Sequence, residues 1–191
     1  MISKLIRFLK YTAPLFLRHP LWRANRLAPF LRFAKLQFIF ATGHNQVNIR
    51  WIEKLILPIK QGDNGLTGNY YLGLHEFEDM AFAIHILREN DSFVDVGANL
   101  GSYSLLASGA SKAFSFAYEP VPSTYSKLKQ NIIINSLSNK VSTSMIAITS
   151  PNNVASGKPI RFSTDKGAMN AFVDYAYSGS TIEVALSLIH I

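Results

Sequence analysis

The clearest pattern of hydrophobic and polar positions lies between residues 92 and 148, where short apolar runs alternate with amphipathic stretches. We expect strand, helix, strand, helix and strand over 92–96, 100–108, 113–118, 123–135 and 140–148. Strands that alternate with short helices are typical of a parallel sheet in an α/β domain. The pattern therefore predicts an α/β fold, with further strand-like pieces at 160–162, 171–177 and 181–184.

The segment before this region has shorter signals. Residues 47–51 and 55–59 alternate apolar and polar side chains and predict two short strands. The stretch 61–73, QGDNGLTGNYYLG, is rich in glycine and contains Asp-Asn-Gly, so it is interpreted as hairpin and loop. Glu76, Glu78 and Asp79, followed by apolar residues at helical spacing, predict a helix over 76–88.

The first 40 residues predict two helices, an amphipathic one over 2–11 and an aromatic-rich one over 21–40. Pro14 and Pro20 are expected to break the first pattern, and Pro29 to break or kink the second. No apolar run approaches the roughly 18 to 20 residues that a membrane span needs. The segment also lacks the pattern of a cleavable signal peptide.

Charge changes this picture because it is unevenly spread. The whole chain of 191 residues carries a net charge of +7, whereas residues 1–60 alone carry a net +10. Two interpretations of the N-terminal segment stay open: its helices pack on a globular domain, or residues 1–40 lie on an anionic membrane surface. No nucleic-acid motif is present, so no nucleic-acid partner is expected.

The chain contains no cysteine, which excludes disulfides, thiolate metal sites and a cysteine nucleophile. This composition fits a reducing compartment. The expected location is therefore the cytoplasm, with or without attachment to a membrane surface, and no metal site is predicted.

Candidate chemistry centres on residues 93–108, FVDVGANLGSYSLLAS, where a predicted strand passes through glycines into a predicted helix. A phosphate-binding P-loop needs Gly-Lys-Ser/Thr, which is absent here. A dinucleotide fingerprint, G-x-G-x-x-G from Gly97, would place Asn99 and Ser102 where glycines belong. A dinucleotide is disfavoured, although an oxidoreductase domain of the NAD type stays an alternative.

The pattern present is D-x-G-x-N-x-G, formed by Asp95, Gly97, Asn99 and Gly101. It suits an adenosine with an amino-acid tail and no phosphate. Gly97 would let that tail approach the backbone, Asp95 would face its ammonium group, and helix amides near residue 100 would face its carboxylate. Glu119, at the end of the second predicted strand, could accept two hydrogen bonds from ribose hydroxyls.

With these residues in view, the chain resembles the FkbM-type family of S-adenosylmethionine-dependent methyltransferases. The resemblance rests on D-V-G-A-N-x-G and on E-P-x-P followed by a helix with Leu128, Asn131 and Asn135. It implies a Rossmann-like methyltransferase fold with S-adenosyl-L-methionine as cofactor. By position, it implies the cofactor contacts Asp95, Gly97, Asn99, Gly101 and Glu119. It also implies O-methylation of a hydroxyl on a small molecule or glycan, such as a sugar or a secondary metabolite.

The sequence does not name a catalytic base. His44, His75 and His85 are candidates, and none has a partner acid at a telling spacing. Tyr70 and Tyr71 could line a pocket just before the domain, or could simply pack in its core.

The domain organisation predicted is a basic helical segment over 1–45, followed over 46–191 by the N-terminal half of the methyltransferase domain. The family pattern continues with more strands than this chain contains, so an incomplete parallel sheet with an exposed apolar face is expected. We therefore predict that this polypeptide alone is poorly stable and inactive. Besides the oxidoreductase domain, the second alternative function is a non-catalytic membrane-surface module.

The last six residues, LSLIHI at 186–191, carry two interpretations. They can be encoded by a DNA string that resembles a transposon end used in library preparation, which makes an adapter origin our hypothesis. The alternative is an ordinary apolar strand.

Overall fold

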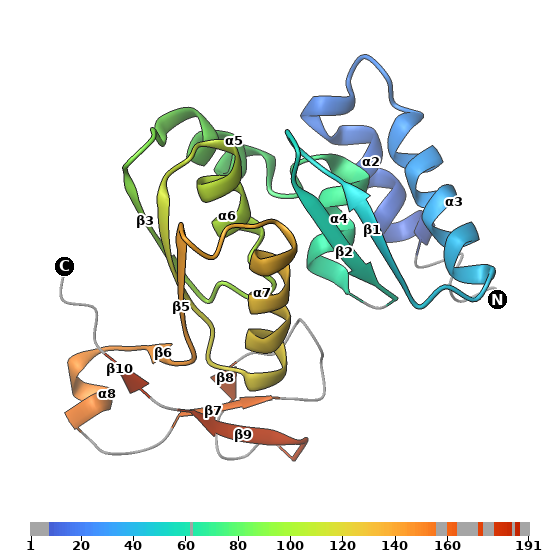
Figure 1. Ribbon diagram of the computed structural model, residues 1–191. Helices are drawn as coiled ribbons and strands as arrows, with labels where there is room; N and C mark the ends of the chain where they lie inside the picture. The colour runs from blue at the N-terminus through green and yellow to red at the C-terminus, as the bar shows by residue number, and fades with distance from the viewer. Residues whose placement is uncertain are drawn as a thin grey trace.

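The computed structural model describes residues 8–61, 63–155, 160–163, 172–173, 178–184 and 186–187. Figure 1 shows a small parallel sheet with helices against one of its faces, next to a second group of helices and a hairpin from the N-terminal third. The strand-rich C-terminal segment lies beside the end of the sheet where its strands finish.

The parallel sheet has the order β3-β4-β5. Its strands are β3 (Ser92–Val96), β4 (Phe114–Tyr118) and β5 (Val141–Ser144). A short α6 (Ser102–Leu105), extended by a π-helical turn (Leu106–Ala110), joins the first two strands, and α7 (Pro122–Ile134) joins the last two. The predicted α/β fold with a parallel sheet is confirmed, and its β-α-β-α-β order is Rossmann-like. The first helix begins at Ser102, two residues later than predicted.

One face of this sheet is open among the described residues. Val94 and Val96 of β3 are 47% and 55% exposed, and Phe114 and Phe116 of β4 are 40% and 41% exposed. These side chains alternate with buried Asp95 and Ala117, as residues on opposite faces of a strand do. Parallel sheets normally bury both faces, so the exposed apolar face expected from the sequence is present.

The predicted strand over 140–148 is two strands. After β5, residues 145–146 leave the sheet, and β6 (Ala147–Ile148) pairs in parallel with β10 (Leu186–Ser187). Between them come α8 (Pro151–Ala155), β7 (Ile160–Ser163), β8 (Phe172–Val173) and β9 (Thr181–Val184). β7 pairs antiparallel with β8 and β9, which confirms strands near 160 and 181. Of the predicted strand 171–177, only 172–173 lie within the described residues.

The N-terminal helices are broken near Pro20 and Pro29, as predicted, but not at Pro14. A π-helical turn (Phe8–Thr12) runs directly into α2 (Ala13–Arg18), so Pro14 lies in the first turn of α2 and does not end the helix. Pro20 opens a 3-10 turn (Pro20–Trp22), and Pro29 lies in the first turn of α3 (Ala28–Ala41). Proline lacks only an amide that the first turn leaves unpaired anyway, which is why these positions accept it. Residues 2–7 of the predicted first helix lie outside the described residues.

The two short strands predicted next are confirmed as the antiparallel pair β1 (Gln46–Arg50) and β2 (Ile56–Lys60). The interpretation of 61–73 as hairpin and loop is wrong, because α4 (Asn64–Leu72) forms there. Gly73, with φ of 85°, follows the last residue of α4 and ends the helix. Burial of Leu66 and Leu72 in the core stabilises α4 despite the glycines that it contains. The predicted helix over 76–88 is confirmed as α5 (Phe77–Ile86).

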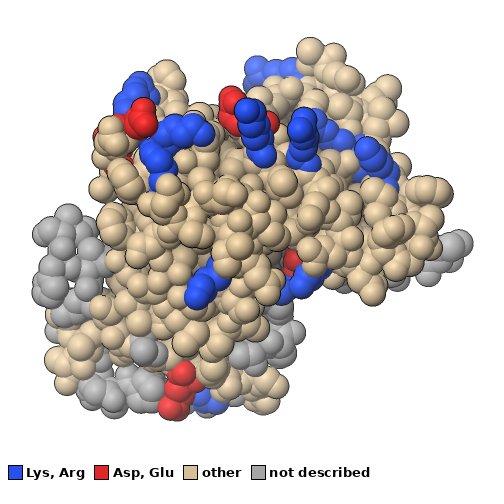
Figure 2. Space-filling model, in the orientation of Figure 1, with Lys and Arg blue, Asp and Glu red and all other residues tan. Residues whose placement is uncertain are grey.

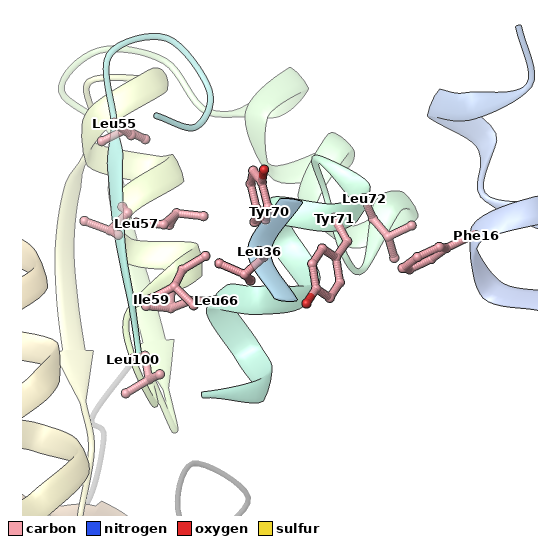
Figure 3. Packing of buried hydrophobic residues seen from close by; sticks show 11 residues of the cluster. Phe16, Leu36, Leu55, Leu57, Ile59, Leu66, Tyr70, Tyr71, Leu72 and Leu100 are labelled. Carbon is pink, nitrogen blue, oxygen red and sulfur yellow. The ribbon is translucent and has the colours of Figure 1, made fainter. Parts of the chain in front are cut away.

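The main hydrophobic cluster joins the N-terminal segment to the α/β unit (Figure 3). Phe16 of α2 and Leu36 of α3 are buried in the same cluster as Leu57 of β2, Leu66 of α4 and Leu100 of the loop after β3. The helices of residues 8–41 therefore pack on the domain, as the first of the two interpretations expected. The boundary at residue 45 stays a prediction.

No helix among the described residues is both long enough and apolar enough to cross a bilayer.

Candidate functional site

The turn after β3 is held against the end of β4 by its own backbone. The amides of Gly97 and Ala98 both donate to the carbonyl of Tyr118 at 2.9 Å. Gly97, Asn99 and Gly101 have φ values of 75°, 51° and 87°. Glycine adopts this left-handed region without strain, and asparagine tolerates it better than most residues. The D-x-G-x-N-x-G spacing thus matches the backbone conformation of the turn.

Glu119 connects the two strand ends. Its Oε2 accepts a hydrogen bond from the amide of Asn99 at 3.0 Å, and its Oε1 accepts one from the amide of Val121 at 2.9 Å. Burial raises the pKa of Glu119, the two amides oppose that rise, and the charge of Asp95 adds to it. A carboxylate offers about four acceptor positions, so the two amides leave capacity for ligand hydroxyls.

Asp95 is buried at the base of the turn. Its Oδ2 accepts hydrogen bonds from the amide of Ser104 at 3.1 Å and from the Ser104 hydroxyl at 2.6 Å. Burial raises the pKa of Asp95, and both bonds from Ser104 oppose that rise. Part of the carboxylate therefore caps the first turn of α6, a role that the sequence did not predict. The amide of Ser104 is one of the helix amides expected to face a ligand, and it is already paired with Asp95.

Two cavities lie on either side of the turn, and Gly97 and Asn99 line both. The first, of about 190 Å³, has Glu119 in its wall, with Ile146 of the β5–β6 connection and Phe162 of β7 among its apolar lining. The second, of about 210 Å³, is lined by Asp95 and by residues of the segment 65–80. Each cavity has one of the two predicted acids, and the turn separates them.

The two glycines of the motif have different surroundings. A Cβ on Gly97 would meet nothing within 4 Å, so the space in front of this backbone is open. A Cβ on Gly101 would lie 2.6 Å from Cδ1 of Leu128, a side chain of α7. Gly97 is placed where a ligand could approach the backbone, whereas Gly101 allows α6 and α7 to pack closely. The prediction that Gly101 contacts a cofactor stays untested.

The other motif residues of α7 fasten that helix to the rest of the domain. Asn131 Nδ2 donates to the carbonyl of Leu100 at 2.7 Å. The Asn135 side chain accepts from the amide of Ile56 at 2.7 Å and donates to the Ile56 carbonyl at 2.9 Å. These side chains therefore position the turn and β2.

The second cavity includes residues that sequence reasoning did not assign to a site. Glu76 and Tyr103 line it, and the Tyr103 hydroxyl donates to Oε2 of Glu76 at 2.7 Å. Burial, together with the hydrogen bond to Glu76, raises the pKa of Tyr103. The sequence indicates Glu76 only as an acid at the start of the helix over 76–88. Nothing in the sequence around Glu76 indicates that this residue, directly before α5, would lie beside the turn after β3.

The structure separates the candidate bases. His75 lines the second cavity together with Asp95 and Gly97. His44 is exposed and bonds Thr42 through Nδ1 at 3.1 Å, and His85 is exposed on α5. Only His75 of these three lines a cavity at the turn.

Tyr70 and Tyr71 belong to the main core and not to either cavity at the turn. Both are 8% exposed, and the ring of Tyr71 packs edge-on against Phe16. Burial raises the pKa of Tyr71 to about 12. The packing interpretation therefore holds for Tyr71, whereas Tyr70 also lines a cavity together with Arg50 and Trp51, as the other interpretation expected.

Charges at the two cavities are one-sided. Asp95, Glu119 and Glu76 line them, and the described lining of both cavities contains neither Lys nor Arg. Among the described residues no cluster of three or more His, Cys, Asp or Glu side chains is arranged to hold a metal ion. The site is therefore suited to a ligand with positive charge and hydroxyl groups.

No protein-family model matches this sequence, and no curated protein matches it. Solved structures with a similar fold include TYW2 from P. horikoshii in complex with MeSAdo (16% identity, TM-score 0.43) and TYW2 from M. jannaschii in complex with AdoMet (20%, 0.43). Another is precorrin-6y C5,15-methyltransferase from Geobacter metallireducens GS-15 (17%, 0.34).

These matches cover 63%, 55% and 42% of this chain, in the same order. They cover 49%, 51% and 53% of the matched proteins, so the chain spans about half their length. At such low identities and TM-scores, what those proteins bind remains a property of those proteins.

Proposed function

We propose that the two cavities together hold S-adenosyl-L-methionine and that the protein is a methyltransferase of the class that uses it. The observation that carries the proposal is the placement of two buried acids, Glu119 and Asp95, in separate cavities that share the backbone of Gly97 and Asn99. A nucleoside with an amino-acid tail needs one polar anchor at each end and an unobstructed backbone between them.

Glu119 would hold the nucleoside end. Its carboxylate is fixed by the amides of Asn99 and Val121, so its remaining acceptor positions are preorganised for ribose hydroxyls. Ile146 and Phe162 supply apolar surface in the same cavity, where a purine ring could pack.

Asp95 and Glu76 would hold the amino-acid end. Both line the second cavity, and carboxylates attract an ammonium or sulfonium group there with no competing cation in the described lining. The cofactor supplies an electrophilic methyl group. The task of this chain's residues is to hold and align that group beside the acceptor.

The same charges disfavour a dinucleotide. Its pyrophosphate would lie at Gly97 and Asn99, between Glu119 and Asp95, with neither Lys nor Arg in the described lining. The negative charges of the pyrophosphate and of the two carboxylates would repel each other, which opposes binding. The charges in the described lining therefore weigh against the oxidoreductase alternative.

We further propose O-methylation of a hydroxyl on a sugar or secondary metabolite, on the strength of the family resemblance. His75 is our candidate base, because it lines the second cavity with Asp95. A test of this role is His75→Gln in a longer chain that completes the sheet, where kcat for methyl transfer should fall while the affinity for S-adenosylhomocysteine stays near that of the wild type.

The first experiment is isothermal titration calorimetry of the full chain with S-adenosylhomocysteine and with NAD. We expect binding of the first and none of the second. Glu119→Gln and Asp95→Asn should each weaken S-adenosylhomocysteine binding on the order of tenfold, the usual effect of losing a charged hydrogen-bond partner.

Glu89→Gln is the matched control, because Glu89 is exposed and lies outside both linings. Its affinity should equal that of the wild type. Tighter binding of NAD than of S-adenosylhomocysteine, or unchanged affinity in both site variants, would overturn the proposal.

A further inference from the structure

Helix α3 has apolar side chains on two opposite faces. Its inner face contains buried Pro29 and Leu36, together with Phe33, which packs against the main core. Leu31 and Phe38 point away from that face and are 67% and 70% exposed. A helix that is apolar all round is normally covered on all sides, so the outer face of α3 requires an explanation.

The outer face forms one stripe. Leu27 precedes α3 and is 70% exposed, and Leu31, Lys35 and Phe38 follow it at helical spacings of four, four and three residues. Residues at these spacings lie above one another on a helix. The stripe therefore presents large apolar side chains with a lysine among them.

The segment before α3 also has exposed apolar side chains. Five of its apolar side chains are between 41% and 63% exposed: Leu9, Tyr11, Leu15, Leu17 and Leu21. α2 packs against α3 through Phe16. The ring of Phe16 packs edge-on against the ring of Phe30, with 5.2 Å between the ring centres. We call the exposed apolar residues of 9–38 the N-terminal apolar surface.

Positive charge accompanies this surface. Lys10, Arg18, Arg23, Arg26 and Lys35 are all exposed, and residues 8–52 contain neither Asp nor Glu. In Figure 2 the upper right part, over the N-terminal helices and hairpin, has mostly Lys and Arg among its coloured residues.

Arg32 differs from these exposed cations, since it packs inward. Its guanidinium lies 4.4 Å from the ring centre of Trp22, and Nη1 donates to the carbonyl of Tyr70 at 3.0 Å. Among the outward-facing cations, Lys10 lies 5.3 Å from the ring centre of Tyr11, an exposed residue of the same surface.

We propose that the N-terminal apolar surface binds an anionic lipid membrane in the plane of its headgroups. Leucine and phenylalanine side chains would enter the boundary of the acyl chains, and the surrounding Arg and Lys side chains would meet lipid phosphates. A second copy of the chain fits less well, because it would bring two surfaces of the same strong positive charge together. The inference is independent of the proposed methyltransferase activity.

The test is sedimentation of the full chain with vesicles of phosphatidylcholine alone and of phosphatidylcholine with phosphatidylserine. We expect binding only to the second kind, with the affinity falling as salt is raised. The double variant Leu31→Glu/Phe38→Glu should bind on the order of tenfold or more weakly, because it removes buried apolar area and adds repulsion.

The matched control is Phe82→Glu/Ile133→Glu. Phe82 and Ile133 are 62% and 61% exposed on α5 and α7 and do not belong to the N-terminal apolar surface. This control adds the same two charges and should bind as the wild type does. Circular dichroism of both variants checks that they are folded.

Three outcomes would overturn the proposal. The first is equal binding to both kinds of vesicle, or to neither kind. The second is an equal loss in the control variant. The third is a wild-type protein that does not bind vesicles but forms a dimer in velocity sedimentation, when the double variant Leu31→Glu/Phe38→Glu is a monomer.

Discussion

The carboxylate of Glu119 accepts a hydrogen bond of 3.0 Å from the backbone amide of Asn99, which lies 20 residues earlier in the chain. The acid at the end of β4 therefore fixes the turn at the end of β3 before any ligand is present. A residue expected only to bind a cofactor also builds the site that would receive it.

Glu119→Ala tests this structural role. Removing the carboxylate leaves the amides of Asn99 and Val121 without their acceptor, which should lower the free energy of unfolding by about 2 kcal/mol. Urea denaturation provides the measurement. Glu89→Ala, at an exposed position, should change it by less than about 0.5 kcal/mol; equal values for the two variants would contradict the role.

Gly101→Ala and Gly97→Ala should have different effects. Both glycines have positive φ, but only at Gly101 would the new methyl group also press on Leu128. We expect Gly101→Ala to lower the free energy of unfolding by about 2 kcal/mol and Gly97→Ala by about 1 kcal/mol. Gly97→Ala should instead impair S-adenosylhomocysteine binding more than its stability change explains. Thermal melts measure stability, and calorimetry measures affinity for S-adenosylhomocysteine. A larger loss of stability in Gly97→Ala and a larger loss of affinity in Gly101→Ala would contradict these roles.

The ionisation of Asp95 should make stability depend on pH. Burial raises the folded-state pKa of Asp95 above 3.8, so just above that pH the folded state holds more protons than the unfolded state. The contribution of this residue to the free energy of unfolding therefore falls as pH rises from 3.8 through the raised pKa. Asp95→Asn, which keeps an acceptor for Ser104, should lack this fall. Denaturation of both proteins between about pH 4 and about pH 7 compares them, and parallel curves would contradict the prediction.

The open face of the parallel sheet should bind apolar dyes. Val94 and Phe116 are neighbours in register on that face and are both more than two-fifths exposed. Val94→Thr/Phe116→Thr should reduce fluorescence of anilinonaphthalene sulfonate and self-association, with a small effect on stability. The control Ile133→Thr, a substitution of an exposed residue on α7, should leave the dye signal unchanged. A signal that persists in the double variant would place the dye elsewhere.

The sequence by itself determined the β-α-β-α-β unit. β3 was predicted with its observed bounds, because apolar side chains at strand spacing and the glycines after them are local signals. The left-handed backbone at Gly97, Asn99 and Gly101 follows from the same local chemistry. These features depend on neighbours in the chain, which a sequence displays directly.

Tertiary structure decided the rest. The glycine-rich stretch that looks like a loop becomes α4 because Leu66 and Leu72 can be buried against β2 and α3, a gain that no local propensity reveals. The same packing takes Tyr70 and Tyr71 into the core. It brings Glu76 and His75 to the turn, and it supplies Ser104 as the partner of Asp95. Burial and long-range hydrogen bonds depend on residues that are far apart in sequence, and only the folded chain places them together.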